Sequence, residues 1–345
     1  PREGGAHYDD AVVVQAALAA AARAHFHNTG PTGQRAISMV EAELRAAVSA
    51  GLPSDVVARS EAQGAAVAEH VLAWSADDGG AVVENMGFPY THALGGGPEH
   101  WAPTSLIAQQ QMPLLPRWGE NRPFAMPSGA SCEIPDPPAY SEEPGSPFHA
   151  EAREVHAVWR SLTVEQRAIA RFWSDDPMLS PTPPGHWIAI ALRILEDRDL
   201  DLDRSVDALA RLGVGLADAF IGCWRTKFRV NLVRPVTYIR RVIDPAFEPI
   251  MTTPPFPEYP SGHSTQSGAA ATVLTDVFGD GYAFEDTTHV DDGIPARSFP
   301  SFWAAAQEAG VSRLYGGIHF RAAIEQGLDQ GRCIGAHTNA LVTWR

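Results

Sequence analysis

Apolar residues recur at helical spacing over most of the chain. Near its beginning, Ala, Leu and Val positions separated by Gly or Pro predict helices over Tyr8–Phe26, Gln34–Ala50 and Pro53–Trp74. The same spacing predicts later helices over Phe148–Arg160, Thr163–Trp173, Gly185–Glu196, Asp203–Phe228, Gly262–Phe278, Ser298–Gly310 and Ile318–Leu341. Thr163 and Gln166 have the spacing of a capping box. No series of alternating apolar and polar residues predicts a sheet.

Residues 77–147 lack this periodicity and are rich in Gly, Pro and aromatic residues. A loop of this length in a compact protein usually has a function or wraps the surface, so we expect an ordered covering segment. The expected fold is all-α, with two packed helical bundles joined by this segment in one continuous domain, 1–345. Its parts are N-terminal helices (1–76), the irregular segment (77–147) and a helical catalytic part (148–345).

Composition narrows the classes of partner. The 345 residues include 45% hydrophobic and 19% charged residues, an ordinary balance for a globular protein, and the formal net charge is −15. This charge disfavours nucleic acid and anionic membranes as partners. A protein this acidic must gather its few cations locally in order to bind an anion.

The expected location is soluble, because no apolar run is long enough to cross a bilayer. The Ala-rich stretch 11–24 is interrupted by Gln15 and Arg23, which is typical of an amphipathic helix and not of a secretory signal. Since the chain begins at Pro1, a cytoplasmic location and a periplasmic or secreted one after leader removal both stay open. A homo-oligomer is compatible with the sequence but is not indicated by it.

Cys132, Cys223 and Cys333 lie far apart, without a Cys-x-x-Cys spacing. Their odd number excludes a fully paired disulfide framework and argues against a zinc cluster. Buried thiols, or one disulfide with one free thiol, remain as alternatives.

Three short segments in the last third of the chain concentrate cations and histidines. In the first, Lys227 and Arg234 lie seven residues apart, about two helical turns, so both can point the same way. Pro235 is expected to end that helix and to determine where Arg234 is presented. Taken alone, a Lys and an Arg at this spacing usually form a solvated face.

The second segment is Pro260-Ser261-Gly262-His263. Ser261 is a suitable N-cap for the Ala-rich helix that follows, and the free N–H groups of a helix start favour an oxyanion. Gly262 allows the backbone to approach such an anion closely. A capped helix with an incidental histidine is the alternative.

The third segment places Arg313 before Gly316-Gly317 and His319 after it. The two glycines are expected to break one helix so that another starts. Together the segments offer three cations, one helix start and two histidines, which is a donor set for a tetrahedral or trigonal-bipyramidal oxyanion.

The patterns Lys-x6-Arg-Pro, Pro-Ser-Gly-His and Ser-Arg-x5-His thus occur in order, at Lys227–Pro235, Pro260–His263 and Ser312–His319. In these motifs the sequence resembles the vanadium haloperoxidase and type-2 phosphatidic acid phosphatase superfamily, and most of all its bacterial vanadium-dependent haloperoxidases. The motif-bearing part covers about 224–325. The residues around Trp118-Gly119 and Pro183–Trp187 are similar to bacterial haloperoxidases as well.

The resemblance implies an enzyme with vanadate as its cofactor and His319 as the direct vanadium ligand. It implies His263 as the general acid/base toward hydrogen peroxide, with Lys227 as a further catalytic residue. The vanadate oxygens would be held by Lys227, Arg234, Ser261, Gly262 and Arg313. With vanadium(V) as Lewis acid, peroxide would oxidise halide to hypohalous acid, which then reaches small organic acceptors.

Haloperoxidases of this type resemble one another in a Trp three residues before the Lys and an aromatic residue or His seven before the motif His. Here these are Trp224 and Phe256, which are expected to form a dry halide pocket, with core packing as the alternative. Iodide is the most easily oxidised halide and the expected substrate, with bromide next and chloride last.

One residue departs from the superfamily pattern, which usually has Asp four residues after the last His. This chain has Ala323, so Glu325, a backbone carbonyl or water would have to support the imidazole of His319. The missing Asp weighs more against the alternative function, an acid phosphatase in which His319 attacks phosphorus and His263 protonates the leaving group. A third hypothesis is an oxyanion-binding protein without turnover, against which the presence of His263 argues.

Overall fold

The computed structural model describes residues 2–80, 93–105, 112–176 and 181–343. The chain forms two compact units, Pro1–Ala81 and Val82–Arg345. In the described ranges the regular structure is α-helical apart from two short strands and one 3-10 turn, which confirms the all-α prediction. Residues 81–92 and 106–111 of the expected irregular segment lie outside the described residues.

The first unit contains the three predicted N-terminal helices, α1 (Asp10–His25), α2 (Pro31–Ser49) and α3 (Ser54–Ser75). Asp9 caps α1 by accepting a hydrogen bond from Val12 N at 3.1 Å. None of these helices, nor any other in the described ranges, has the length and hydrophobicity needed to cross a bilayer.

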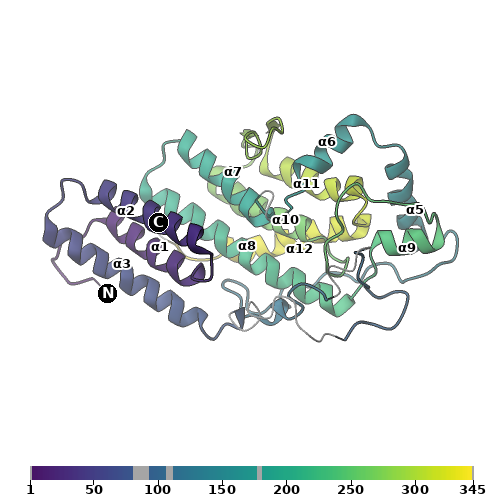
Figure 1. Ribbon diagram of the computed structural model, residues 1–345, viewed down its shortest axis with the longest axis horizontal. Helices are drawn as coiled ribbons and strands as arrows, with labels where there is room; N and C mark the ends of the chain where they lie inside the picture. The colour runs from purple at the N-terminus through teal and green to yellow at the C-terminus, as the bar shows by residue number, and fades with distance from the viewer. Residues whose placement is uncertain (1, 81–92, 106–111, 177–180, 344–345) are drawn as a thin grey trace. The chain divides into compact units, whose positions relative to one another are not determined.

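The second unit contains the remaining elements (Figure 1). In chain order they are η1 (Trp118–Glu120), α5 (Pro147–Arg160), α6 (Val164–Phe172), α7 (Pro183–Asp197), α8 (Leu202–Val230), α9 (Pro235–Val242), α10 (Gly262–Phe278), β1 (Phe284–Asp286), β2 (Arg297–Phe299), α11 (Phe302–Gly316) and α12 (Arg321–Asn339). The two strands pair antiparallel, with Glu285 opposite Ser298.

Helix α10 lies at the centre of this unit and packs against α7, α8, α11 and α12. It is buried along most of its length, so small residues on all its sides suit its position. A Cβ atom on Gly268 would lie 2.5 Å from the carbonyl oxygen of Leu328, and one on Gly331 would lie 2.3 Å from that of Thr265. These glycines therefore let the backbones of α10 and α12 approach closely, which holds the start of α10 in place.

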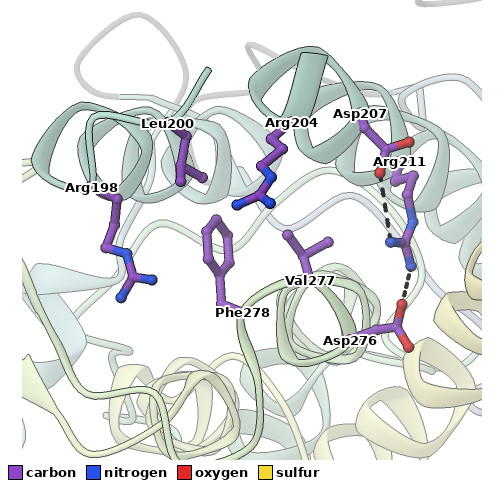
Figure 2. Close-up of a pocket in the computed structure, with 8 residues that line it drawn as sticks. All are labelled: Arg198, Leu200, Arg204, Asp207, Arg211, Asp276, Val277 and Phe278. Atoms are coloured by element: carbon purple, nitrogen blue, oxygen red, sulfur yellow. Dashed lines mark hydrogen bonds and ion pairs between the residues drawn. The ribbon is translucent and has the colours of Figure 1, made fainter. Parts of the chain in front are cut away.

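A surface pocket of about 380 Å³ lies at the N-terminal half of α8 (Figure 2). Its arginines already have partners: Arg211 forms ion pairs with Asp207 and Asp276, Arg204 forms one with Asp201, and Arg198 lies over the ring of Tyr282. Arg211 precedes Lys227 by 16 residues of one helix, a separation of about 24 Å. This pocket is therefore distinct from the predicted oxyanion site.

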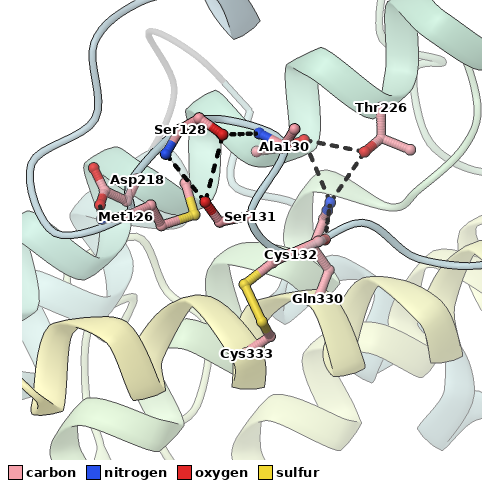
Figure 3. Close-up of a disulfide and its surroundings, with 10 residues drawn as sticks. Met126, Ser128, Ala130, Ser131, Cys132, Asp218, Thr226, Gln330 and Cys333 are labelled. Carbon is pink, nitrogen blue, oxygen red and sulfur yellow. Dashed lines mark hydrogen bonds between the residues drawn. A yellow bond between two sulfur atoms is a disulfide. The ribbon is translucent and has the colours of Figure 1, made fainter.

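The described residues of the irregular segment from 112 to 146 are anchored to the helices (Figure 3). The buried carboxylate of Asp218 on α8 accepts three backbone N–H bonds, from residues 124, 125 and 126, at 2.7–2.9 Å. Cys132 forms a disulfide with Cys333 on α12, and Cys223 is a buried free thiol. Of the two cysteine alternatives, one disulfide with one free thiol is present.

Three details of the predicted helices are wrong. Pro235 does not end a helix that carries Arg234: α8 ends at Val230, and Pro235 is the first residue of α9, which the sequence analysis did not predict. Proline suits the first helical position because its missing N–H is not needed there. The helix expected over Ser298–Gly310 begins later, at Phe302, because its first residues belong to β2. The last helix starts at Arg321 and not at Ile318.

Candidate active site

Lys227 and Arg234 come from two elements that meet at a left-handed turn. Lys227 lies in the last turn of α8, Asn231 ends that helix with φ of 52°, and Arg234 is the N-cap of α9. Both side chains are fully buried. The two cations are thus brought together by the turn and not by a shared helical face.

Backbone carbonyls of the Pro-rich segment before α10 surround these two cations. Lys227 Nζ donates to the carbonyl oxygens of Pro257 at 2.9 Å and Glu258 at 3.0 Å, and also to that of Pro260. Arg234 donates to Phe256 O through Nε at 2.8 Å. Carbonyl dipoles compensate a buried charge only in part, so burial lowers the pKa of Lys227 to about 7 and that of Arg234 to about 10.

His319 follows the break between α11 and α12, as predicted. Gly316 ends α11 and Gly317 adopts φ of 78°, a left-handed conformation that favours glycine. The imidazole is almost fully buried. Its Nε2 lies 3.1 Å from NH1 of Arg234, and its Nδ1 lies 2.9 Å from Oε1 of Glu258.

These contacts assign the tautomer of His319. A guanidinium group can only donate, so Nε2 of His319 accepts from Arg234 and carries a lone pair. The ring proton is then on Nδ1, which donates to Glu258. Burial and the positive charges of Arg234 and Lys227 keep the pKa of His319 well below its usual value, so the ring is neutral. A neutral imidazole with its lone pair on Nε2 is the form that binds a metal at that nitrogen.

Glu258 is the site residue that the sequence analysis missed. Its Oε1 accepts from both His319 Nδ1 and Phe320 N, the latter at 2.8 Å. Glu325, one of the expected supports of His319, instead points to solvent beside Arg321. Ala323, which replaces the usual Asp, is buried in the apolar core. A lone acidic residue in the Pro- and aromatic-rich segment before Ser261 was the signal that could have identified Glu258.

The start of α10 matches the prediction for the second segment. Ser261 is the N-cap, and its Oγ accepts from Ser264 N at 3.3 Å, so its hydroxyl proton remains free to donate. Gly262 and His263 are the first helical residues, and their N–H groups have no acceptor within the helix. Trp224 packs against this point, since a Cβ on Gly262 would lie 3.7 Å from its ring.

Arg313 and His263 meet at the other side of the site. Arg313 lies near the end of α11 and is buried, with NH1 3.5 Å from His263 Nδ1 and a bond from NH2 to the carbonyl oxygen of Trp173. Nε2 of His263 lies 3.3 Å from Oδ2 of the buried Asp175. Burial and the charge of Arg313 lower the pKa of His263 to about 4, so its ring is neutral at pH 7.

The two predicted aromatic residues also lie beside the cations. The ring centroids of Trp224 and Phe256 are 4.8 Å apart. The ammonium of Lys227 lies 5.1 Å from the Phe256 ring and 5.8 Å from the Trp224 ring. Part of the site wall is therefore apolar, although Trp224 and Phe256 also contribute to packing.

The structure thus brings all nine predicted site residues into one region of the second unit: Lys227, Arg234, Arg313, Ser261, Gly262, His263, His319, and Trp224 and Phe256, which form the wall. Lys227 and Arg234 lie near the buried Glu258, and Arg313 lies near Asp175 and Asp176. The two charges of Lys227 and Arg234 exceed the one that Glu258 can offer, so this side of the site favours an anion, and the donors suit an oxyanion with a metal at its centre.

Comparisons with known proteins agree with this geometry. The profile of a family described as the VCPO second helical-bundle domain matches residues 207–344, which include all the predicted site residues. No curated protein matches the chain. The crystal structure of the first bacterial vanadium-dependent iodoperoxidase is 39% identical, with a TM-score of 0.86, and the match covers 95% of this chain and 79% of that one.

Two bacterial vanadium-dependent chloroperoxidase structures are similar in fold. The holo form is 16% identical with a TM-score of 0.68, and the match covers 95% of this chain and 89% of that one. The apo form is also 16% identical, with a TM-score of 0.73 and coverage of 95% and 82%.

Proposed function

The chain belongs to the vanadium-dependent haloperoxidases and is a vanadium halide peroxidase, and from this premise we propose that it oxidises iodide with hydrogen peroxide. Bromide is the next substrate in this proposal, and the product is the hypohalous acid, which halogenates small organic acceptors. The observation that carries the proposal is the pair of contacts on His319, which keep its Nε2 lone pair among buried cations.

The donor set fits vanadate. His319 Nε2 would bind vanadium, and the oxygens would be held by Lys227, Arg234, Arg313, Ser261 and the backbone of Gly262. Before an anion enters, Lys227 and Arg234 are compensated in part by carbonyl dipoles and by the nearby Glu258. An anionic cofactor would supply the missing charge and would raise the pKa of Lys227 again.

Bound vanadate supplies a Lewis-acidic vanadium(V) centre that activates peroxide toward halide. In the overall reaction, hydrogen peroxide, iodide and one proton give hypoiodous acid and water; iodide loses two electrons and the oxygen–oxygen bond is reduced. His263 would move protons at Nδ1, the nitrogen that faces Arg313. The ring is neutral at pH 7, so it has a lone pair that can accept a proton from peroxide, and the negative charge of bound vanadate would raise its pKa from about 4 toward the operating pH.

The apolar wall of the site favours iodide as the substrate. Trp224 and Phe256 would offer aromatic faces to a large, weakly hydrated anion, while Lys227 beside them supplies charge. The similarity to a bacterial iodoperoxidase supports the same order of halides.

The decisive experiment measures iodide oxidation at fixed peroxide, with and without added orthovanadate. We expect activity only with vanadate and a loss of activity in excess phosphate, which competes for the same donors. His319→Ala should lose bound vanadium on dialysis. His263→Ala should keep vanadium while its rate falls by about 10²–10⁴, the range for a lost proton transfer.

His156→Ala is the matched control, because this buried histidine also contacts a carboxylate, Asp244 at 2.9 Å, but lies outside the site. Activity that is independent of vanadate contradicts the proposal. Hydrolysis of a phosphate ester by the apoprotein, lost in His319→Ala, would instead support the acid phosphatase. The carboxylate of Glu258 on His319 keeps that second function open, because it would also strengthen a histidine nucleophile.

A further inference from the structure

Behind His263 lies a cluster of buried titratable groups that the proposed function does not use. Asp175 follows α6, His186 lies in α7, and His289 follows β1. The three are almost fully buried. Asp175 and His186 are 11 residues apart, whereas His289 lies more than a hundred residues after both. The cluster is continuous with the candidate site through Asp175.

The groups form a continuous series from the site to solvent. Nε2 of His263 lies 3.3 Å from Oδ2 of Asp175, and Oδ1 of Asp175 lies 3.5 Å from Nε2 of His289. Nδ1 of His289 lies 3.2 Å from Oδ2 of Asp292. His289 is 2% exposed, whereas the side chain of Asp292 is 49% exposed, so Asp292 is where the series reaches water.

Each member presents one atom to the group before it and another atom to the group after it. His263 has Nδ1 toward Arg313 and the site and Nε2 toward Asp175. Three of the facing atoms are buried and form no hydrogen bond in the described residues: His263 Nε2, Asp175 Oδ2 and His289 Nε2. Small side-chain rotations would align the two longer contacts, as is common when a site without substrate closes.

His186 holds Asp175 in position from the side. Its Nδ1 lies 2.9 Å from Asp175 Oδ1 and its Nε2 lies 2.8 Å from Asp286 Oδ2, and the ring stacks on Trp173 at 4.5 Å. The branch through His186 ends at Asp286, whose side chain is fully buried, so His186 positions Asp175 and does not lead to solvent. The other charged groups near Asp175 are Asp176 and Arg313.

We propose that Asp175, His289 and Asp292 form a proton path that exchanges protons between Nε2 of His263 and solvent. The proposal rests on the proposed function, because that reaction takes up one proton in each turnover. A proton accepted at one nitrogen of an imidazole can be released from the other. A carboxylate that accepts a proton at one oxygen becomes a neutral carboxyl group, which can turn about its Cβ–Cγ bond and release the proton to the group on its other side. When His263 gains a proton at Nδ1, Nε2 can release one to Asp175, and the reverse transfer returns it.

The test uses the vanadate-loaded protein with His289→Gln and Asp292→Asn. Glutamine and asparagine keep polar side chains of similar size but do not ferry protons. At saturating peroxide and iodide, His289→Gln should lose about 10²-fold in kcat, the lower end for a lost proton transfer. Added imidazole buffer should restore part of the rate, and vanadium content should equal that of the native protein. His156→Gln, at the remote pair with Asp244, should change none of these quantities.

A second readout does not depend on turnover. In the apoprotein, exchange of the His263 ring Nε2–H proton with water, followed by 15N NMR, should be slower in both path variants. The proposed path is overturned if His289→Gln has the same kcat as the native protein and the same rate of His263 proton exchange. If His289→Gln does not fold, the Asp292→Asn variant replaces it in the test, because a half-exposed side chain tolerates the change. An unaltered kcat and an unaltered exchange rate in Asp292→Asn also overturn the proposed path. If the native protein oxidises no halide, the proposed function fails, while the exchange measurement still tests the path.

Discussion

Replacement of Glu258 by Gln tests how His319 is held. The substitution keeps the shape of the side chain but removes the negative charge that Glu258 carries above its pKa, which burial raises to about 8. That carboxylate accepts from both His319 Nδ1 and Phe320 N. Hydrogen bonds to a charged acceptor are roughly twice as strong as neutral ones, and loss of a group that orients a metal ligand typically costs 10–100-fold in affinity. We therefore expect vanadate to bind about 10–100-fold more weakly, or about 1.4–2.7 kcal/mol.

An opposing effect has to be weighed, since removing a carboxylate leaves the pocket more positive and could attract an anion. Lys227 cancels it. Burial already lowers the pKa of Lys227 to about 7, and Glu258 is one of the groups that raise it. Without the Glu258 carboxylate this pKa falls further, which removes the remaining charge of Lys227 at pH 8. At pH 6 Glu258 is already protonated, because burial raises its pKa to about 8, and Gln then replaces a neutral group. The loss of affinity should therefore be larger at pH 8 than at pH 6.

The assay is calorimetric titration of orthovanadate into the apoprotein at both pH values. Glu151→Gln is the matched control, because Glu151 also accepts a backbone N–H at the start of α12, that of Ala322 at 3.1 Å, without a contact to His319. We expect the control to bind as the native protein does. Native affinity of Glu258→Gln at both pH values would falsify the role given to Glu258, and equal losses in both variants would mean that α12 itself was displaced.

The remaining predictions concern stability. Burial lowers the pKa of His186, but Asp175 and Asp286 outweigh it and raise that pKa to about 9, so its stabilisation is complete below pH 6.5 and is lost as pH rises through 9. The difference in unfolding free energy between the native protein and His186→Gln should shrink by roughly 3 kcal/mol from pH 6 to pH 10, measured by urea titration; a constant difference contradicts this. Cys132→Ser opens a disulfide that joins residues 201 positions apart and should lower the unfolding free energy by about 2–5 kcal/mol, with no further effect of reductant on the variant. Asp218→Ala leaves three backbone N–H groups without their acceptor, which should cost at least about 3 kcal/mol and speed hydrogen exchange at residues 124–126; unchanged exchange there speaks against the anchor.

Helical periodicity and three short motifs determined much of this protein in advance. The long helices appear near their predicted places because an amphipathic pattern is local to each segment. Lys227, Arg234, Arg313, His263 and His319 could be singled out because cations and imidazoles are the donors that an oxyanion requires. The break at Gly316-Gly317 was also predictable, since a left-handed helix end favours glycine.

The partners of those residues were decided only by the tertiary structure. Whether Pro235 ends a helix or begins one depends on the turn at Asn231, and both uses of proline are common. Glu258 lies 61 residues before His319, and Asp175 lies 88 before His263 in a segment without a motif. A hydrogen bond between such distant residues leaves no periodic trace in the sequence, because it depends on how the elements pack and not on the spacing within any one of them.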